Sequence, residues 1–205
     1  MRGANVESKT WATDLEAVAR VVARLGARYE GLLDQVDTYF RVPQGRLKLR
    51  ETSHRAPDRR VSTSCELIRY ERPDATGARV SRYERTEIDD AESCRARLLA
   101  DHGLRGCVRK RRELWMLDST RVHLDRVEGL GDFVELETVS AGVPGAADRL
   151  AHDRLSVALG LDSDATVEGS YIDLLELRAG TAAAFPAIRL ISRCHGRTGS
   201  RRSAS

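Results

Sequence analysis

Short segments in which charged and apolar residues alternate are the feature that most constrains the fold of this chain. Arg46–Glu51 (RLKLRE), Arg121–Val127 (RVHLDRV) and Phe133–Val139 (FVELETV) place charged side chains at every second position, with mainly apolar ones between them. Because successive side chains of a strand point to opposite faces, each segment predicts a strand with one charged and one apolar face. A sheet built from such strands has to separate a charged side from an apolar side.

The rest of the chain predicts more strands than helices. We expect further strands at 4–9, 36–42, 65–72, 77–86 and 107–117, a polar loop at 52–62, and helices at 14–25, 89–102 and 144–159. Residues 170–177 fit either the end of a strand or a short helix. Many consecutive strands with few helices between them favour an antiparallel barrel or a strongly curved sheet, with the helices packed outside.

Length, cysteine spacing and charge limit the number of domains and the partners that we expect for this protein. A chain of 205 residues predicts one domain, at 1–178, followed by a basic, disordered tail at 179–205. The four cysteines lie far apart, which argues against a zinc site or a disulfide framework. No long apolar run and no secretory signal are evident, so we expect a cytoplasmic protein without membrane contact, either a monomer or a homodimer. The formal net charge of +3 argues against a nucleic-acid partner, because such proteins usually carry a more one-sided charge.

Lysine is rare and occurs only on the charged strand faces. Of the 34 basic residues, three are lysines: Lys9, Lys48 and Lys110. Lys9 shares a face with Asn5 and Glu7, whereas the faces that carry Lys48 and Lys110 are wholly cationic. If the sheet closes with these faces inward, the lumen suits a multivalent anion, because Lys and Arg bind phosphate oxygens and carboxylates coordinate Mg²⁺ or Mn²⁺. The spacing alone does not decide whether these faces point inward or outward.

Several segments, taken together and in order, resemble the CYTH superfamily. This superfamily contains class IV adenylyl cyclases, thiamine triphosphatases and inorganic triphosphatases. The resemblance runs from about Ala4 to Leu177 and is closest to the adenylyl cyclase-like branch. The segments that carry it are Asn5–Lys9, Asp37–Phe40, Gly45–Glu51, Leu67–Pro73, Arg121–Gly131, Phe133–Glu137 and Ser170–Leu175.

The resemblance implies an α+β fold, in which an eight-stranded antiparallel β-barrel forms a triphosphate tunnel with helices outside. The implied substrate-binding residues are all basic: Lys9, Arg46, Lys48, Arg50, Arg69, Lys110, Arg112 and Arg121. The implied metal ligands, for Mg²⁺ or Mn²⁺, are Glu7, Glu135 and Glu137. The implied catalytic residues are Lys9, Arg112, Asp125 and Glu135.

The chain departs from the pattern of the superfamily at two places. Asn5 replaces the first glutamate of the ExExK signature, which leaves the number of metal ions open. The middle strand lacks the usual lysine, and Arg69 and Arg72, on opposite faces, are the candidates to replace it. We also expect Tyr171 and Asp173 to close one end of the barrel.

The leading hypothesis for function is a metal-dependent phosphohydrolase that cleaves a nucleoside triphosphate, inorganic tripolyphosphate or thiamine triphosphate. One alternative is a class IV adenylyl cyclase, which converts ATP to cyclic AMP and pyrophosphate in a site of the same kind. The other is a noncatalytic module that binds a nucleotide or polyphosphate. His123, on the charged face of its strand, fits a general base, a phosphate donor or a histidine hydrogen-bonded to a neighbouring carboxylate.

Overall fold

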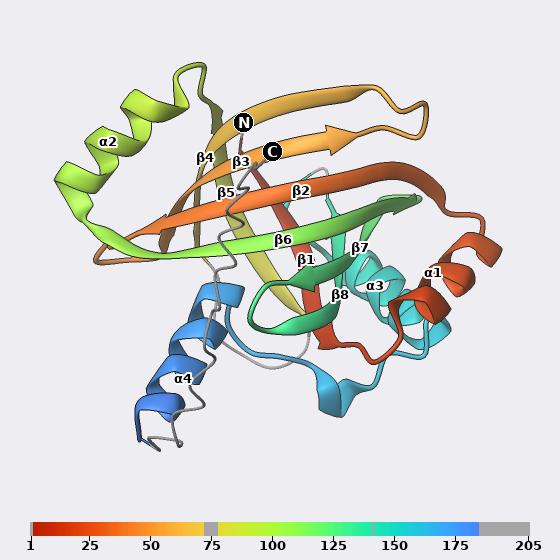
Figure 1. The fold of residues 1–205 in the computed structure, drawn as a ribbon. Coiled ribbons are helices and arrows are strands. Elements are labelled where there is room, and N and C mark those ends of the chain that lie inside the picture. The colour runs from red at the N-terminus through yellow and green to blue at the C-terminus, as the bar shows by residue number, and fades with distance from the viewer. Residues whose placement is uncertain (1, 72–77, 141, 185–205) are drawn as a thin grey trace, which may run out of the picture.

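The computed structural model describes residues 2–71, 78–140 and 142–184. Eight antiparallel strands close into a barrel in the order β1-β5-β4-β3-β2-β6-β7-β8, and β8 pairs with β1 (Figure 1). The strands are β1 Arg2–Trp11, β2 Arg28–Phe40, β3 Arg46–Arg55, β4 Val61–Glu71, β5 Arg79–Glu87, β6 Leu104–Leu117, β7 Thr120–Val127 and β8 Gly131–Val139. The helices are α1 Leu15–Arg24, α2 Ala91–His102, α3 Ala146–Ala158, the short 3₁₀ helix Ser163–Ala165, and α4 Tyr171–Ala184. The expected α+β barrel is confirmed.

The charged strand faces point into the barrel. In the register between β1 and β8, Lys9 lies opposite Glu135 and Glu7 opposite Glu137, and between β7 and β8 His123 lies opposite Glu135. Residues that lie opposite each other in a sheet project to the same face, so the register brings these charges together inside the barrel. The lysines at positions 9, 48 and 110 are buried. Closure of the barrel thus places the charged strand faces in the lumen and not on the exterior.

The apolar strand faces point outward and are covered by helices. Leu15 and Val22 of α1 and Leu155 of α3 pack on a buried cluster that includes Val122 and Leu136 of the barrel. Figure 1 shows α1 and α3 on the same side of the barrel, whereas α2 lies over another side, where its Cys94 and Leu98 meet β2 and β3. Burying these faces under helices stabilises the barrel and keeps its charged lumen intact.

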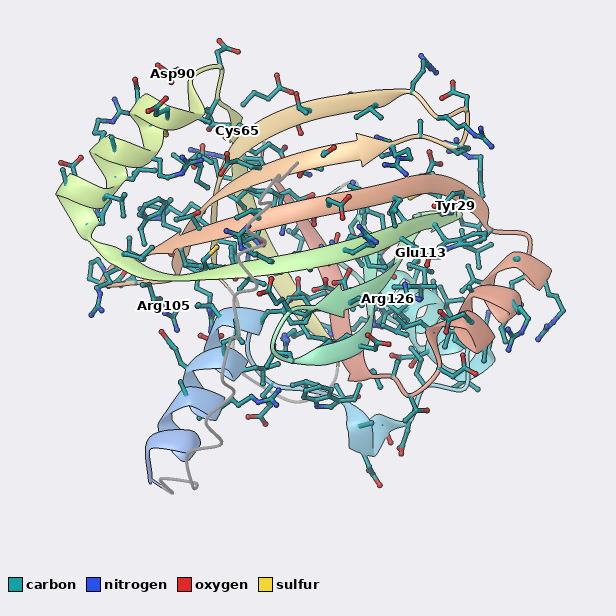
Figure 2. The ribbon with its side chains drawn as sticks, viewed as in Figure 1. Tyr29, Cys65, Asp90, Arg105, Glu113 and Arg126 are labelled. Carbon is teal, nitrogen blue, oxygen red and sulfur yellow. The ribbon has the colours of Figure 1, made fainter. Side chains whose placement is uncertain are left out.

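The start of α4 closes one end of the barrel. Tyr171 and Ile172 join an apolar cluster with residues from the strands, among them Tyr39, Tyr70 and Phe133. Asp173 accepts hydrogen bonds from Arg46 at 2.7 Å and from Arg105 at 2.6 Å, and Arg105 is labelled beside α4 in Figure 2. The expected closure by Tyr171 and Asp173 is confirmed, and residues 170–177, left open as strand or helix, are mainly helical.

The prediction of a polar loop at 52–62 is wrong for most of these residues. Strand β3 continues to Arg55 and β4 begins at Val61, and Thr52 pairs with Ser64. The Ser and Thr residues on both faces of this hairpin are polar in the sequence and show no apolar alternation, so periodicity could not identify the strands, although threonine favours strands. Helix α4 runs to Ala184, past the expected domain end at 178. Most of the predicted tail, residues 185–205, and the candidate Arg72 lie outside the described residues. No helix in the described residues is long and apolar enough to cross a membrane.

Candidate functional site: a charged cavity in the barrel

The barrel encloses a cavity of about 250 Å³, lined by side chains from all eight strands and by the start of α4. Six of the predicted substrate-binding residues line it: Lys9, Lys48, Arg50, Lys110, Arg112 and Arg121. All three predicted metal ligands line it as well: Glu7, Glu135 and Glu137. Opposite charges thus share one partly enclosed space, in which their interactions are stronger than in bulk water.

Asp37 of β2 holds three of the cations in place. Its carboxylate accepts hydrogen bonds from Lys48 at 2.9 Å, from Arg50 at 2.6 and 2.7 Å, and from Lys110 at 3.2 Å. Asp37 is 1% exposed; burial would raise its pKa, but Arg50, Lys110 and Lys48 hold the pKa well below its usual range. Asp37 is therefore ionised and offsets part of the repulsion between the three cations.

The two lysines beside Asp37 have lowered pKa values. Burial, together with the charge of Arg50, lowers the pKa of Lys48 to about 7 and that of Lys110 to about 8. Burial is the larger cause and repulsion from Arg50 adds to it, so the single carboxylate of Asp37 does not offset both effects. A bound anion would restore the balance, so this side of the cavity is suited to phosphate groups.

Arg112 lies between two carboxylates. It donates two hydrogen bonds to Asp125, at 2.6 and 2.5 Å, and one to Glu135 at 2.5 Å. Asp125 also accepts a hydrogen bond from the Tyr171 hydroxyl at 2.7 Å, is fully buried and does not line the cavity. The structure thus places Asp125 behind Arg112, where its carboxylate orients the guanidinium. The catalytic role expected for Asp125 stays a prediction, and its contacts favour a role in positioning Arg112.

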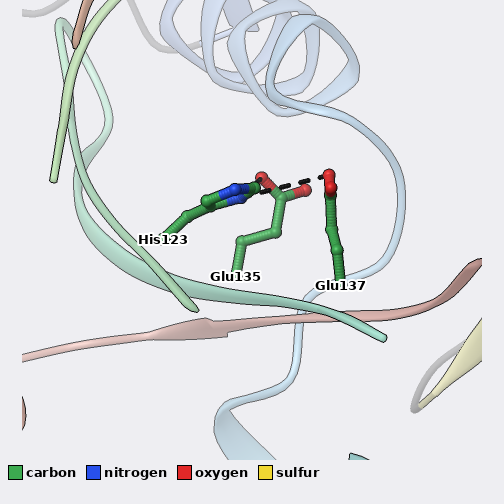
Figure 3. Close-up of side chains that lie close together, drawn as sticks. All are labelled: His123, Glu135 and Glu137. Carbon is green, nitrogen blue, oxygen red and sulfur yellow. Dashed lines mark ion pairs between the residues drawn. The ribbon is translucent and has the colours of Figure 1, made fainter. Parts of the chain in front are cut away.

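Glu135, Glu137 and His123 form a compact group of possible metal ligands (Figure 3). Their ligand atoms all lie within 4.8 Å of one another, and Glu7, which lines the same cavity, is not part of this group. Burial would raise the pKa of Glu135, but Lys9 and Arg112 hold it well below its usual range. Burial and the charge of Arg112 lower the pKa of His123. Ionised carboxylates beside a neutral imidazole fit a divalent cation.

Two of the predicted binding residues lie away from the cavity. Arg46 is buried at the closed end, where it pairs with Asp173, and it does not line the cavity. Arg69 is exposed and lies opposite Leu47 on the outer face of the barrel, so the structure does not bring it together with the other predicted binding residues. The neighbouring positions Ile68 and Tyr70 are the ones that point into the cavity.

Sequence reasoning missed Asp37, Arg79 and Arg85. Arg85 lines the cavity, and Arg79 is buried with its Nε 3.6 Å from Glu7 and its guanidinium near the carbonyls of Val167 and Gly169. These arginines alternate with Ser81 and Tyr83 along the inner face of β5. The alternation is visible in the sequence, but charged residues also occupy the outer face of β5 and conceal it.

A closed antiparallel barrel with cations, carboxylates and a histidine in its lumen defines the class of this protein: a β-tunnel with a charged interior. The chain belongs to the CYTH domain family, whose family model matches residues 4–167. No curated protein matches the chain.

Solved structures share the fold. The PH1012 protein of Pyrococcus horikoshii OT3 is 23% identical, with a TM-score of 0.67, over 83% of this chain and 98% of that one. A Vibrio parahaemolyticus protein, provisionally described as an adenylate cyclase, is 20% identical, with a TM-score of 0.63, over 84% of this chain and 97% of that one. At these identities the likeness establishes the fold alone.

Proposed function

We propose that this protein is a metal-dependent enzyme that binds a triphosphate in its tunnel and hydrolyses it. The observation that carries the proposal is the composition of one cavity. There, Lys48, Arg50 and Lys110 gather around Asp37, and the carboxylates Glu135 and Glu137 lie beside His123. A linear polyphosphate with a divalent cation carries both signs of charge and matches both groups.

The size of the cavity favours the phosphate chain as the part that enters it. Its volume of about 250 Å³ is just below the range of roughly 300–1,000 Å³ that drug-sized ligands occupy. Helix α4 closes one end, so a ligand enters from the other end, where Leu33 and Leu114 line the cavity. An organic group on the triphosphate would then stay near this entrance.

The chemistry of phosphoryl transfer suits such a site. Water attacks the terminal phosphorus, the bond to the bridging oxygen breaks, and the leaving phosphate chain keeps the electron pair of that bond. The enzyme mainly has to position the chain and stabilise negative charge. Arg112, fixed by Asp125 and Glu135, provides a preorganised donor for phosphate oxygens. The divalent ion, held by the glutamates, would supply further charge neutralisation.

Cyclisation of ATP is the competing reaction. The structural neighbour from Vibrio parahaemolyticus, provisionally described as an adenylate cyclase, favours it. In that reaction the ribose 3′-hydroxyl attacks the α-phosphorus and pyrophosphate leaves. The products separate the two activities, since a hydrolase releases inorganic phosphate and a cyclase releases cyclic AMP.

The test is to incubate the purified protein with ATP, tripolyphosphate and thiamine triphosphate, each with Mg²⁺ or Mn²⁺, and to separate all products. We expect release of phosphate that is lost in the variant Arg50→Gln. The matched control is Arg69→Gln, which removes an arginine from the outer face of the same barrel and should leave the rate unchanged. Cyclic AMP would establish a cyclase, and triphosphate binding without turnover would establish a noncatalytic module.

A further inference from the structure

His123 carries a buried nitrogen that lacks a hydrogen-bond partner in the part of the chain that the structure describes. Its side chain is 4% exposed, it lines the cavity, and its Nδ1 makes no hydrogen bond. An unsatisfied buried polar atom costs roughly 1–3 kcal/mol, so a native protein rarely keeps one without a reason.

The nearest acidic atoms are too far from Nδ1 for hydrogen bonds but well placed to share a cation with it. Glu135 Oε2 lies 3.7 Å from Nδ1 and Glu137 Oε1 lies 4.0 Å from it. Two ligands bound at about 2.1 Å to one ion lie between roughly 3.0 Å apart, when adjacent, and roughly 4.2 Å apart, when opposite. Figure 3 shows the imidazole and both carboxylates converging on one another.

The sheet register and the neighbouring cations hold these groups in place. His123 and Glu135 lie opposite each other on β7 and β8, and Glu137 follows on the same face of β8. Lys9 donates to Glu135 at 2.6 Å, and Arg121 donates to Glu137 at 3.4 Å. Hydrogen bonds of this kind orient metal ligands and tune their affinity.

We propose that His123 Nδ1 is a metal ligand beside Glu135 and Glu137, and that the tunnel consequently selects a transition-metal ion such as Mn²⁺ over Mg²⁺. Mg²⁺ prefers oxygen ligands and retains its water, whereas imidazole suits first-row transition metals. The inference rests on the metal dependence of the proposed function. It concerns only which atoms bind the ion, so it can be tested without a triphosphate.

The direct test is pulsed EPR on the intact protein with Mn²⁺ as the only added ligand. We expect a ¹⁴N coupling from a directly bound imidazole, which is lost in both His123→Gln and His123→Leu. A role for His123 in packing alone would give no such coupling. The matched control is His102→Gln, at an exposed histidine of α2, which should keep the signal.

Affinity supplies the second readout. The free Mn²⁺ signal, with and without competing Mg²⁺, gives both dissociation constants. We expect wild-type protein to bind Mn²⁺ at least about tenfold more tightly than Mg²⁺, and His123→Gln to lose most of this preference by weakening Mn²⁺ binding.

Absence of the ¹⁴N coupling, equal affinities for the two ions, or no Mn²⁺ binding at all would each overturn the inference. Its failure is distinguishable from failure of the proposed function. A ¹⁴N coupling in a protein that hydrolyses no triphosphate upholds the ligand and refutes the hydrolase. Hydrolysis that proceeds equally well with either ion, without ¹⁴N coupling, upholds the hydrolase and refutes His123 as a metal ligand.

Discussion

Asp37 gives the sharpest test of how the cavity is built, because one carboxylate faces three cations. Asp37→Asn removes its charge with little change of shape and leaves Lys48, Arg50 and Lys110 without their shared anion. Breaking a buried ion pair costs about 3–5 kcal/mol. The lysines can release their protons, since the pKa values are about 7 and about 8, but the arginine cannot.

We therefore expect a destabilisation near the lower end of that range, about 3 kcal/mol. For a protein of this size each kcal/mol shifts Tm by about 2–4 °C, so Tm should fall by about 6–12 °C. The difference from wild type should widen as the pH falls from 8 to 6, because both lysines are then forced to carry a charge. Thermal unfolding, followed by circular dichroism at several pH values, measures both effects.

The same variant should respond more strongly to a polyanion. With a chelator present to exclude metal, saturating tripolyphosphate should raise the Tm of Asp37→Asn by more than it raises that of wild type, since the ligand supplies the missing negative charge. The matched control is Asp34→Asn on the same strand. The side chains of Asp34 and its partner Arg111 are 52% and 59% exposed, so the loss should stay below about 1 kcal/mol. A Tm for Asp37→Asn within the range of this control, or a smaller tripolyphosphate shift than in wild type, would refute the reasoning.

Three further predictions follow from the buried ionisable groups. Triphosphate binding at pH 8 should take up protons, because the added negative charge raises the lowered pKa values of Lys48 and Lys110. Calorimetry in buffers of different ionisation enthalpy measures this proton uptake, and a net release of protons would contradict the prediction. Asp125→Asn should lower stability by about 3–5 kcal/mol and reduce turnover, since Arg112 loses its bidentate partner. Denaturant unfolding measures the loss of stability and steady-state kinetics the loss of turnover. Unchanged turnover would refute a role for Asp125 in positioning Arg112. Burial lowers the pKa of His152. Its contribution to the stability of the fold is therefore complete above about pH 6.5 and is lost as the pH falls through the lowered pKa. His152→Gln should flatten the dependence of Tm on pH between 7 and 5, and an unchanged slope counts against this.

The sequence by itself determined the strand faces and most of the cavity. Alternation in 46–51, 121–127 and 133–139 identifies strands whose charged and apolar sides differ, because side chains alternate along any strand, whatever surrounds it. The helix starting after Asp14 was also predictable, because an N-cap acts locally: its carboxylate accepts a hydrogen bond from the Ala17 amide at 2.8 Å. The hairpin of β3 and β4 was not, because its polar residues give no contrast between faces.

Only the tertiary structure decided which charges meet. Closure of the barrel turns the charged faces inward and places Arg69 outside, a choice that depends on pairing with distant strands. Asp37 of β2 meets Lys110 of the neighbouring strand β6, and Asp125 is enclosed by Arg112 and Tyr171. His123 gains its two carboxylate neighbours in the same way, through the register of β7 and β8. A sequence specifies local periodicity directly, but the partner of each buried charge is set by register and closure, which arise only when the whole sheet forms.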